Sequence, residues 1–191
     1  MRWILSLCLL AGGLGTAAAD PDFTCAITSS RTTYEVGEVP DLAFRVINHS
    51  AEDVVLVGSL DGSTANMRYP RCVVEILDAS GEKVGGPYMR CGNMNNLSVA
   101  DFILVPAGMG FDPYGKGFFS PPSLAWWPIK DPGEYTLRFH YATSDSIQDY
   151  FGDERWDKRY RGTPEIRRLF ERVPKVDLVS ELKLTFAPKP E

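Results

Sequence analysis

Apolar residues recur at every second position in several short segments of the chain. A two-residue period turns one face of a segment into a core and leaves the other in water, so it predicts half-buried β-strands. The alternation is found at 23–27, 42–47, 72–77, 135–141 and 182–186, and short apolar runs at 54–57 and 102–105 add two further strands. Helical periodicity is absent from these segments, so the chain is predicted to be all-β.

The sequence Asp131-Pro132-Gly133-Glu134-Tyr135 stands at the start of one predicted strand. It resembles the D-x-G-x-Y motif that precedes strand F of immunoglobulin-like sandwiches, where the tyrosine hydroxyl bonds to backbone a few residues upstream. With this motif and strand pattern, the chain resembles exported bacterial proteins of uncharacterised function that carry one immunoglobulin-like or fibronectin-like domain. The resemblance implies an antiparallel immunoglobulin-like β-sandwich with Tyr135 in a structural role. It carries over no catalytic residue.

One long segment, 143–174, interrupts the strand pattern before the last strand. Within it, Thr163-Pro164-Glu165 combines an N-cap residue, an N1 proline and a first-turn acid. Apolar residues then follow at helical spacing, and the stripe consists of Ile166, Leu169, Phe170 and Val173. The segment is therefore predicted to contain a short amphipathic helix. That helix either covers an open end of the core or helps to form a binding surface.

The first nineteen residues have the features of a secretory signal peptide. Arg2 supplies the positive charge, an apolar stretch follows, and Ala17-Ala18-Ala19 offers a cleavage site before Asp20. We therefore expect export to the periplasm or the extracellular space, with residues 20–191 as one domain. Loss of Arg2 changes the formal net charge from −5 to −6. A mildly acidic chain is a poor partner for nucleic acid, and membrane insertion is not expected after signal removal.

Three cysteines remain after the signal: Cys25, Cys72 and Cys91. An oxidising compartment favours one disulfide and one leftover thiol. Cys25 belongs to an alternating run that turns it inward, so Cys72 and Cys91 are the preferred pair. The other pairings stay open.

Motifs for catalysis or metal binding are missing from the sequence. It contains no G-x-S-x-G elbow, no H-E-x-x-H motif and no glycine-rich phosphate loop. The carboxylates between 145 and 157 lack the spacing of an EF-hand loop, and the sulfur ligands near Cys91 have no histidine close in sequence. We expect no cofactor and no metal. Two glycosylation sequons begin at Asn48 and Asn96.

Aromatic residues provide the best clue to function. Trp126 and Trp127 lie in a proline-flanked loop, and the aromatic residues Tyr150, Trp156 and Tyr160 lie among charges in segment 143–174. Large rings beside charged groups suit a protein interface or sugar stacking, and they equally suit a loop packed onto its own sandwich. These five residues form the predicted binding site of a non-enzymatic exported binding module with a protein partner. A carbohydrate-binding module, a proteinase-inhibitor-like domain and an enzyme remain alternatives.

Overall fold

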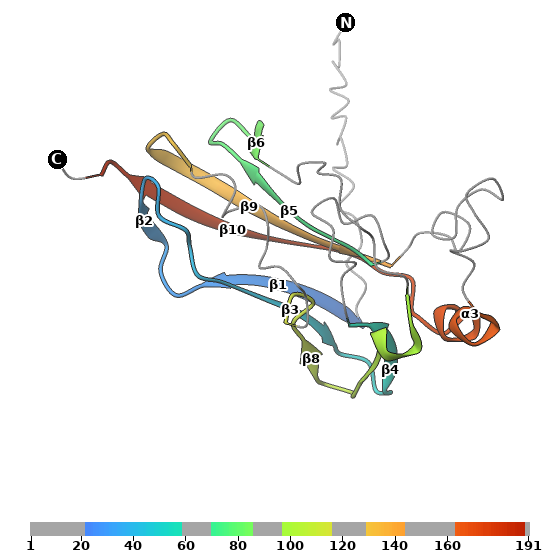
Figure 1. The fold of residues 1–191 in the computed structure, drawn as a ribbon. Coiled ribbons are helices and arrows are strands. Elements are labelled where there is room, and N and C mark those ends of the chain that lie inside the picture. Colours follow the sequence, from blue (N-terminus) through green and yellow to red (C-terminus); the bar gives the residue numbers. More distant parts are fainter. Residues whose placement is uncertain (1–21, 59–69, 86–96, 116–128, 144–162, 190–191) are drawn as a thin grey trace, which may run out of the picture.

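The computed structural model describes residues 22–58, 70–85, 97–115, 129–143 and 163–189 of the 191-residue chain (Figure 1). Most of this part is β-structure. The elements, in chain order, are β1 (Phe23–Ser29), β2 (Thr33–Glu35), β3 (Leu42–Asn48), β4 (Val54–Val57), β5 (Arg71–Leu77), β6 (Lys83–Gly85), the 3-10 helix η1 (Val99–Asp101), β7 (Phe102–Val105), β8 (Gly110–Phe111), β9 (Gly133–Ala142), the helix α3 (Pro164–Glu171) and β10 (Asp177–Ala187). The prediction of an all-β protein with one short helix before the last strand is confirmed.

The strands form two facing layers (Figure 1). One layer is a five-stranded sheet in the order β2-β10-β9-β5-β6, and the other contains a three-stranded sheet in the order β1-β3-β8. The two-stranded sheet β4-β7 lies at one end of the second layer (Figure 1). Among the described strands, β2 and β10 are parallel and all other pairs are antiparallel.

The core lies between the two layers and is centred on β9. Leu137, Phe139 and Tyr141 alternate along this strand and are fully buried, as their two-residue period predicts. The Phe139 ring meets Phe44 of β3 at a centroid distance of 5.1 Å, and Tyr141 meets Phe111 of β8 at 6.2 Å. Both contacts are edge-to-face, an arrangement that aromatic pairs favour. These contacts join the five-stranded sheet to the opposite layer.

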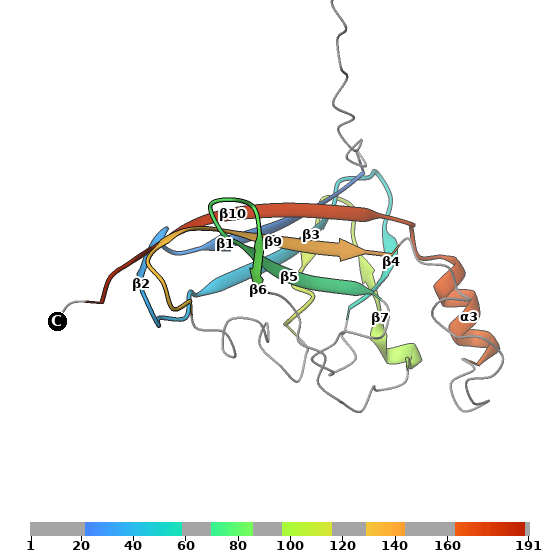
Figure 2. The same ribbon diagram turned by 90° about the horizontal axis from the view of Figure 1, so that it is seen from above.

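The helix α3 begins where the capping sequence predicts. The Thr163 side chain accepts a hydrogen bond from the backbone N–H of Ile166 at 3.3 Å. Ile166 and Phe170 are buried, and Val173 is buried just after the helix. Figures 1 and 2 show α3 beyond one end of both layers rather than over a sheet face. The described part of segment 143–174 therefore covers an open end of the core.

Tyr135 forms the predicted contact with the upstream backbone. Its hydroxyl donates a hydrogen bond to the carbonyl oxygen of Asp131 at 3.0 Å. The ring packs edge-to-face against Phe186 of β10 at a centroid distance of 5.8 Å. Partial burial, followed by the negative charge of Asp131, raises the pKa of the Tyr135 hydroxyl. The D-x-G-x-Y motif thus joins Tyr135 of β9 to the backbone of Asp131, just before the strand begins.

We expect Tyr135→Phe to lower the free energy of unfolding by about 0.5–1 kcal/mol, the net contribution of one hydrogen bond. The bond is exposed to solvent, so the lower part of the usual range applies. Chemical denaturation measures the change. Asp131→Asn is the matched control, since it keeps the accepting carbonyl and should leave the midpoint unchanged. Equal midpoints for Tyr135→Phe and the wild type would contradict a stabilising bond.

The cysteine prediction is only partly supported. Cys25 faces the core between buried Phe23 and Ile27 but is half-buried itself, and this burial raises the pKa of its thiol to about 11. Cys72 is buried, as its alternation predicts. The described part of the chain shows no disulfide, and Cys91 lies outside that part. The structure therefore lends no support to the predicted Cys72–Cys91 bridge.

Asn48, the first residue of a sequon, is fully buried. Its Nδ2 donates hydrogen bonds to the carbonyl oxygens of Glu52 at 2.8 Å and Val105 at 3.1 Å. Its Oδ1 accepts hydrogen bonds from the N–H of Ser50 at 3.0 Å and the Ser50 hydroxyl at 2.7 Å. The side chain therefore joins the turn after β3 to the end of β7 and is not available for glycosylation in the folded protein.

Candidate functional site

The five residues of the predicted binding site lie outside the described residues: Trp126, Trp127, Tyr150, Trp156 and Tyr160. The binding surface predicted from these aromatic side chains is therefore untested. The described residues offer another candidate on the five-stranded sheet.

On the outer face of the five-stranded sheet, the residues of β10 are exposed and no described element covers them. The outward residues of β10 are all exposed: Asp177, Val179, Glu181, Lys183 and Thr185. The opposite layer packs against the inner face only (Figure 1). Val179, with 56% of its surface exposed, is an apolar residue in the middle of this polar strand face. Polar and apolar groups on an uncovered sheet face are the composition expected of a binding surface.

A row of charges crosses the middle of this outer face. The sheet register places Glu75 of β5 and Glu181 of β10 on either side of Arg138 of β9. The Arg138 Nε donates to Glu181 Oε1 at 2.8 Å, while Glu75 Oε1 accepts from Lys83 Nζ at 2.8 Å. Exposed ion pairs such as these contribute little to stability, but they orient the side chains that a partner meets.

The next row contains a histidine that contacts a carboxylate. His140 lies opposite Val73 of β5 and Val179 of β10, on the outward side of β9 as its alternation predicts. Its Nε2 contacts Asp177 Oδ1 at 2.5 Å. No group of three or more histidine, cysteine or acidic side chains able to hold a metal occurs in the described part of the chain. The pair orients the imidazole beside the exposed apolar side chain of Val179.

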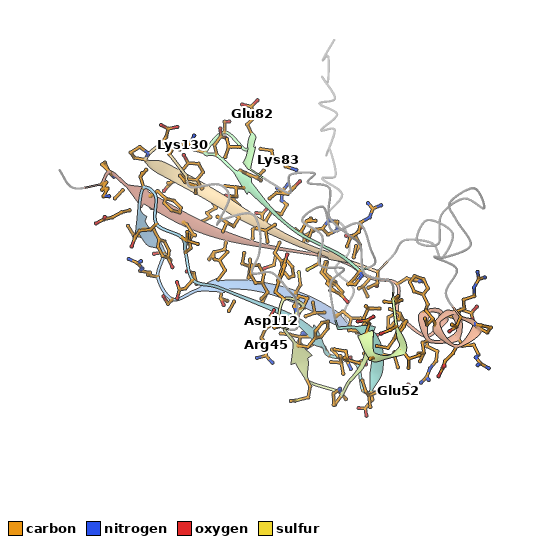
Figure 3. The ribbon with its side chains drawn as sticks, in the orientation of Figure 1. Arg45, Glu52, Glu82, Lys83, Asp112 and Lys130 are labelled. Carbon is orange, nitrogen blue, oxygen red and sulfur yellow. The ribbon has the colours of Figure 1, made fainter. Side chains whose placement is uncertain are left out.

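Towards the other end of β9, the outer face contains a recess of about 330 Å³. Strands β9 and β10 form its floor, and the turn between β5 and β6 forms one wall. Its lining consists of Leu77, Asp78, Ala79, Gly81, Glu134, Tyr135, Thr136, Arg138, Glu181, Lys183, Leu184 and Thr185. Figure 3 shows Glu82, Lys83 and Lys130 around this hairpin. The volume is at the small end for ligand sites, so it suits one side chain or one small ring.

The wall of the recess is a well-ordered turn. Asp78 Oδ1 accepts hydrogen bonds from the Ser80 hydroxyl at 2.6 Å and from the backbone N–H groups of Ser80 and Glu82 at 2.8 and 2.9 Å. These bonds, that of the hydroxyl first, lower the pKa of Asp78. Gly81 has a φ of 82°, a conformation that side chains with a Cβ rarely adopt. The turn therefore gives the recess a fixed shape.

Four polar groups in the floor are not engaged by the protein. Glu134 lies directly opposite Thr185, and Thr136 lies opposite Lys183. The described structure shows no hydrogen bond or ion pair for the side chains of these four residues, whereas Arg138 and Asp78 are both paired. Two hydroxyls, a carboxylate and an ammonium group are thus close together and available to a ligand.

Sequence reasoning missed this recess because no motif marks it. Glu134, Thr136, Lys183 and Thr185 are ordinary polar residues at outward strand positions. The register between β9 and β10 brings them together across some fifty positions of sequence. Only the alternation, which turns them outward, was a usable signal.

Comparison with known proteins provides no family for the chain. No protein-family model matches it, and no curated protein matches its sequence. Separately, no helix in the described ranges is long and apolar enough to cross a membrane.

Proposed function

We propose that this chain is an exported, non-enzymatic binding module with an immunoglobulin-like β-sandwich and a protein partner. The observation that carries the proposal is the outer face of the five-stranded sheet, with its exposed β10 residues and its polar recess. The loop aromatic residues, Trp126, Trp127, Tyr150, Trp156 and Tyr160, extend the proposed binding surface. The Cys72–Cys91 disulfide and the signal peptide of residues 1–19 belong to the same proposal of an exported domain.

The strand order supports an immunoglobulin-like fold. Immunoglobulin sheets contain strands A, B and E in one layer and strands C, F and G in the other. Taken in chain order, β1, β3 and β8 correspond to A, B and E, and β5, β9 and β10 to C, F and G. Tyr135 then stands at the start of strand F, where the tyrosine corner of this class occurs.

The outer face supports a protein partner more than a small ligand. It presents exposed Val179 beside a row of oriented charges, and the recess lies further along the same strands. A flat face with one shallow recess suits an interface in which a single polar side chain of the partner enters the recess. Glu134 and Lys183 could pair with such a side chain without breaking an existing interaction.

A carbohydrate is the second candidate, and one observation favours it. The recess combines the hydroxyls of Thr136 and Thr185 with the Glu134 carboxylate. Hydroxyls and carboxylates are the groups that bind sugar hydroxyls.

Site-specific photo-cross-linking tests the proposal. A photoreactive amino acid at Lys183 places the probe in the recess, and one at Thr28 of β1 places it on the exposed face of the opposite layer. In the envelope of the producing cells, we expect a protein adduct from position 183 and none from position 28. A glycan array with the purified chain tests the second candidate. Equal adducts from both positions, or none, would refute the sheet face as the binding surface.

A further inference from the structure

Exposed apolar side chains are concentrated in one stretch of the chain that includes a strand of the second layer. Six large apolar residues are exposed in the described structure, and three of them fall within 99–109: Val99, Leu104 and Met109. Leu104 has the largest exposed fraction of the six, 60%. An exposed apolar group that recurs around one element indicates an interaction site more often than a scattered one does. The element at the centre of this group is β7.

Strand β7 has an open edge. It pairs with β4 through one side, with Leu104 opposite Val55, and no described strand pairs with its other side. Natural sheets usually protect such edges with charges, prolines or bulges. The sequence Phe102-Ile103-Leu104-Val105 contains none of these. An apolar edge that no described strand covers is a template for another strand.

The edge is held in a fixed conformation. The side chain of Ile103 lies so close to Gly58, the residue after β4, that a Cβ at Gly58 would be 2.6 Å from it. Before β7, Asp101 Oδ2 accepts from the Ser98 N–H at 2.7 Å, and after it Asp53 Oδ1 accepts from the Ala107 N–H at 3.0 Å. Because the strand is ordered in advance, pairing with another strand loses less conformational entropy.

The charges around β7 are acidic. Asp101 and Asp53 stand at its two ends, and residues 22–58 and 97–115 contain eight acidic residues against Arg31 and Arg45. Figure 3 shows Glu52 and Asp112 in the same layer. If β7 of a second copy paired antiparallel with this edge, the acidic ends would face each other, and like charges across a strand pair are destabilising. A strand with basic ends has the complementary charge.

We propose that the open edge of β7 binds an extended peptide segment by β-augmentation. The segment adds a strand beside Phe102–Val105, presents an apolar side chain to Leu104, and carries a lysine or arginine at each end near Asp101 and Asp53. Backbone hydrogen bonds provide affinity in this mode, and the side chains provide specificity. The inference is independent of the outer-face proposal, since the two surfaces belong to different layers.

Peptide binding to the full chain tests the inference. The probe is a short fluorescent peptide of alternating threonine and valine with a lysine at each end, and fluorescence anisotropy measures its binding. We expect binding that weakens with added salt, and about tenfold or more weaker binding to Leu104→Lys and to Met109→Lys. Val84→Lys, at a similarly exposed position in β6 of the other layer, is the matched control and should bind like the wild type.

Three peptide results would overturn the inference: no binding to the wild type, equal binding of a probe with glutamate ends, or undiminished binding of a probe with a methylated backbone. Light scattering on the purified chain adds a further outcome. We expect a monomer. A dimer that Leu104→Lys dissociates would assign the edge to a second copy and refute the peptide partner. Both substituted side chains are exposed, and circular dichroism confirms that the variants are folded.

Discussion

Phe170→Ala is expected to lower the free energy of unfolding by about 3–5 kcal/mol, the usual cost of removing a buried aromatic ring from a core. Phe170 is only 1% exposed, although it lies in a surface helix at the end of the sandwich. Lys175 Nζ lies 4.4 Å from the ring centroid, so the substitution also removes a cation–π contact. Urea denaturation of the purified variant measures the change.

The matched control is Arg168→Ala, an exposed position two residues away on the same helix. Its free energy of unfolding should stay within about 0.5 kcal/mol of the wild type. If both variants behave alike, α3 does not cover the core, and the whole segment 143–174 is available for binding. If they differ as expected, the binding role proposed for this segment rests on its aromatic residues, Tyr150, Trp156 and Tyr160, and not on the apolar stripe of the helix.

Asn48→Ala is expected to cost about 1–3 kcal/mol, the usual cost of leaving a buried group unsatisfied. The substitution removes the amide that donates to the buried carbonyl oxygen of Val105. The Glu52 carbonyl oxygen also loses this donor but keeps the Ser50 hydroxyl at 3.0 Å. Chemical denaturation measures the loss. Ser50→Ala is the control, because it keeps the Asn48 amide and its bond to Val105 and removes a hydroxyl that bonds to Asn48 Oδ1 and, in exposed contacts, to the Glu52 backbone. It should cost about 1 kcal/mol or less.

The same contacts predict that folded material secreted by a glycosylating host carries no glycan at Asn48. Both hydrogens of the side-chain amide are engaged in buried or half-buried bonds, so an attached sugar would break the junction between β3 and β7. Intact and peptide mass spectrometry check this. A folded fraction with a glycan at Asn48 would disprove the structural role of the amide. The sequon that begins at Asn48 therefore serves as a turn in this fold.

The sequence predicted the long strands well because their pattern is local and repeated. In β9, the alternation extends along the strand, and its inward residues Leu137, Phe139 and Tyr141 are fully buried. The helix cap at Thr163 and the corner at Tyr135 were also predictable, since both depend on contacts within a few residues. Strand propensity and helix capping depend on residues a few positions apart, so they can be predicted without knowing which distant segments pack together.

The short strands β2, β6 and β8 were not predicted. Each has only two or three residues, too few to show a period. Tyr34 of β2 is buried because β2 pairs with β10, which lies about 150 residues further along the chain, and its ring stacks on Phe186 at 5.9 Å. The burial of Asn48 was not predicted for the same reason, because its partner at Val105 is distant in sequence.

By itself, the sequence determined which residues form the main strands and the helix, and which of their faces are apolar, because these properties depend on neighbours in the chain. Only the tertiary structure decided how the strands pair, and with it the position of both candidate surfaces. The recess depends on the register of β9 with β10, and the open edge depends on β7 pairing with β4 alone among the described strands. A strand's polar residues look the same in sequence whether they meet a ligand or water, since what faces them is set by segments far away in the chain.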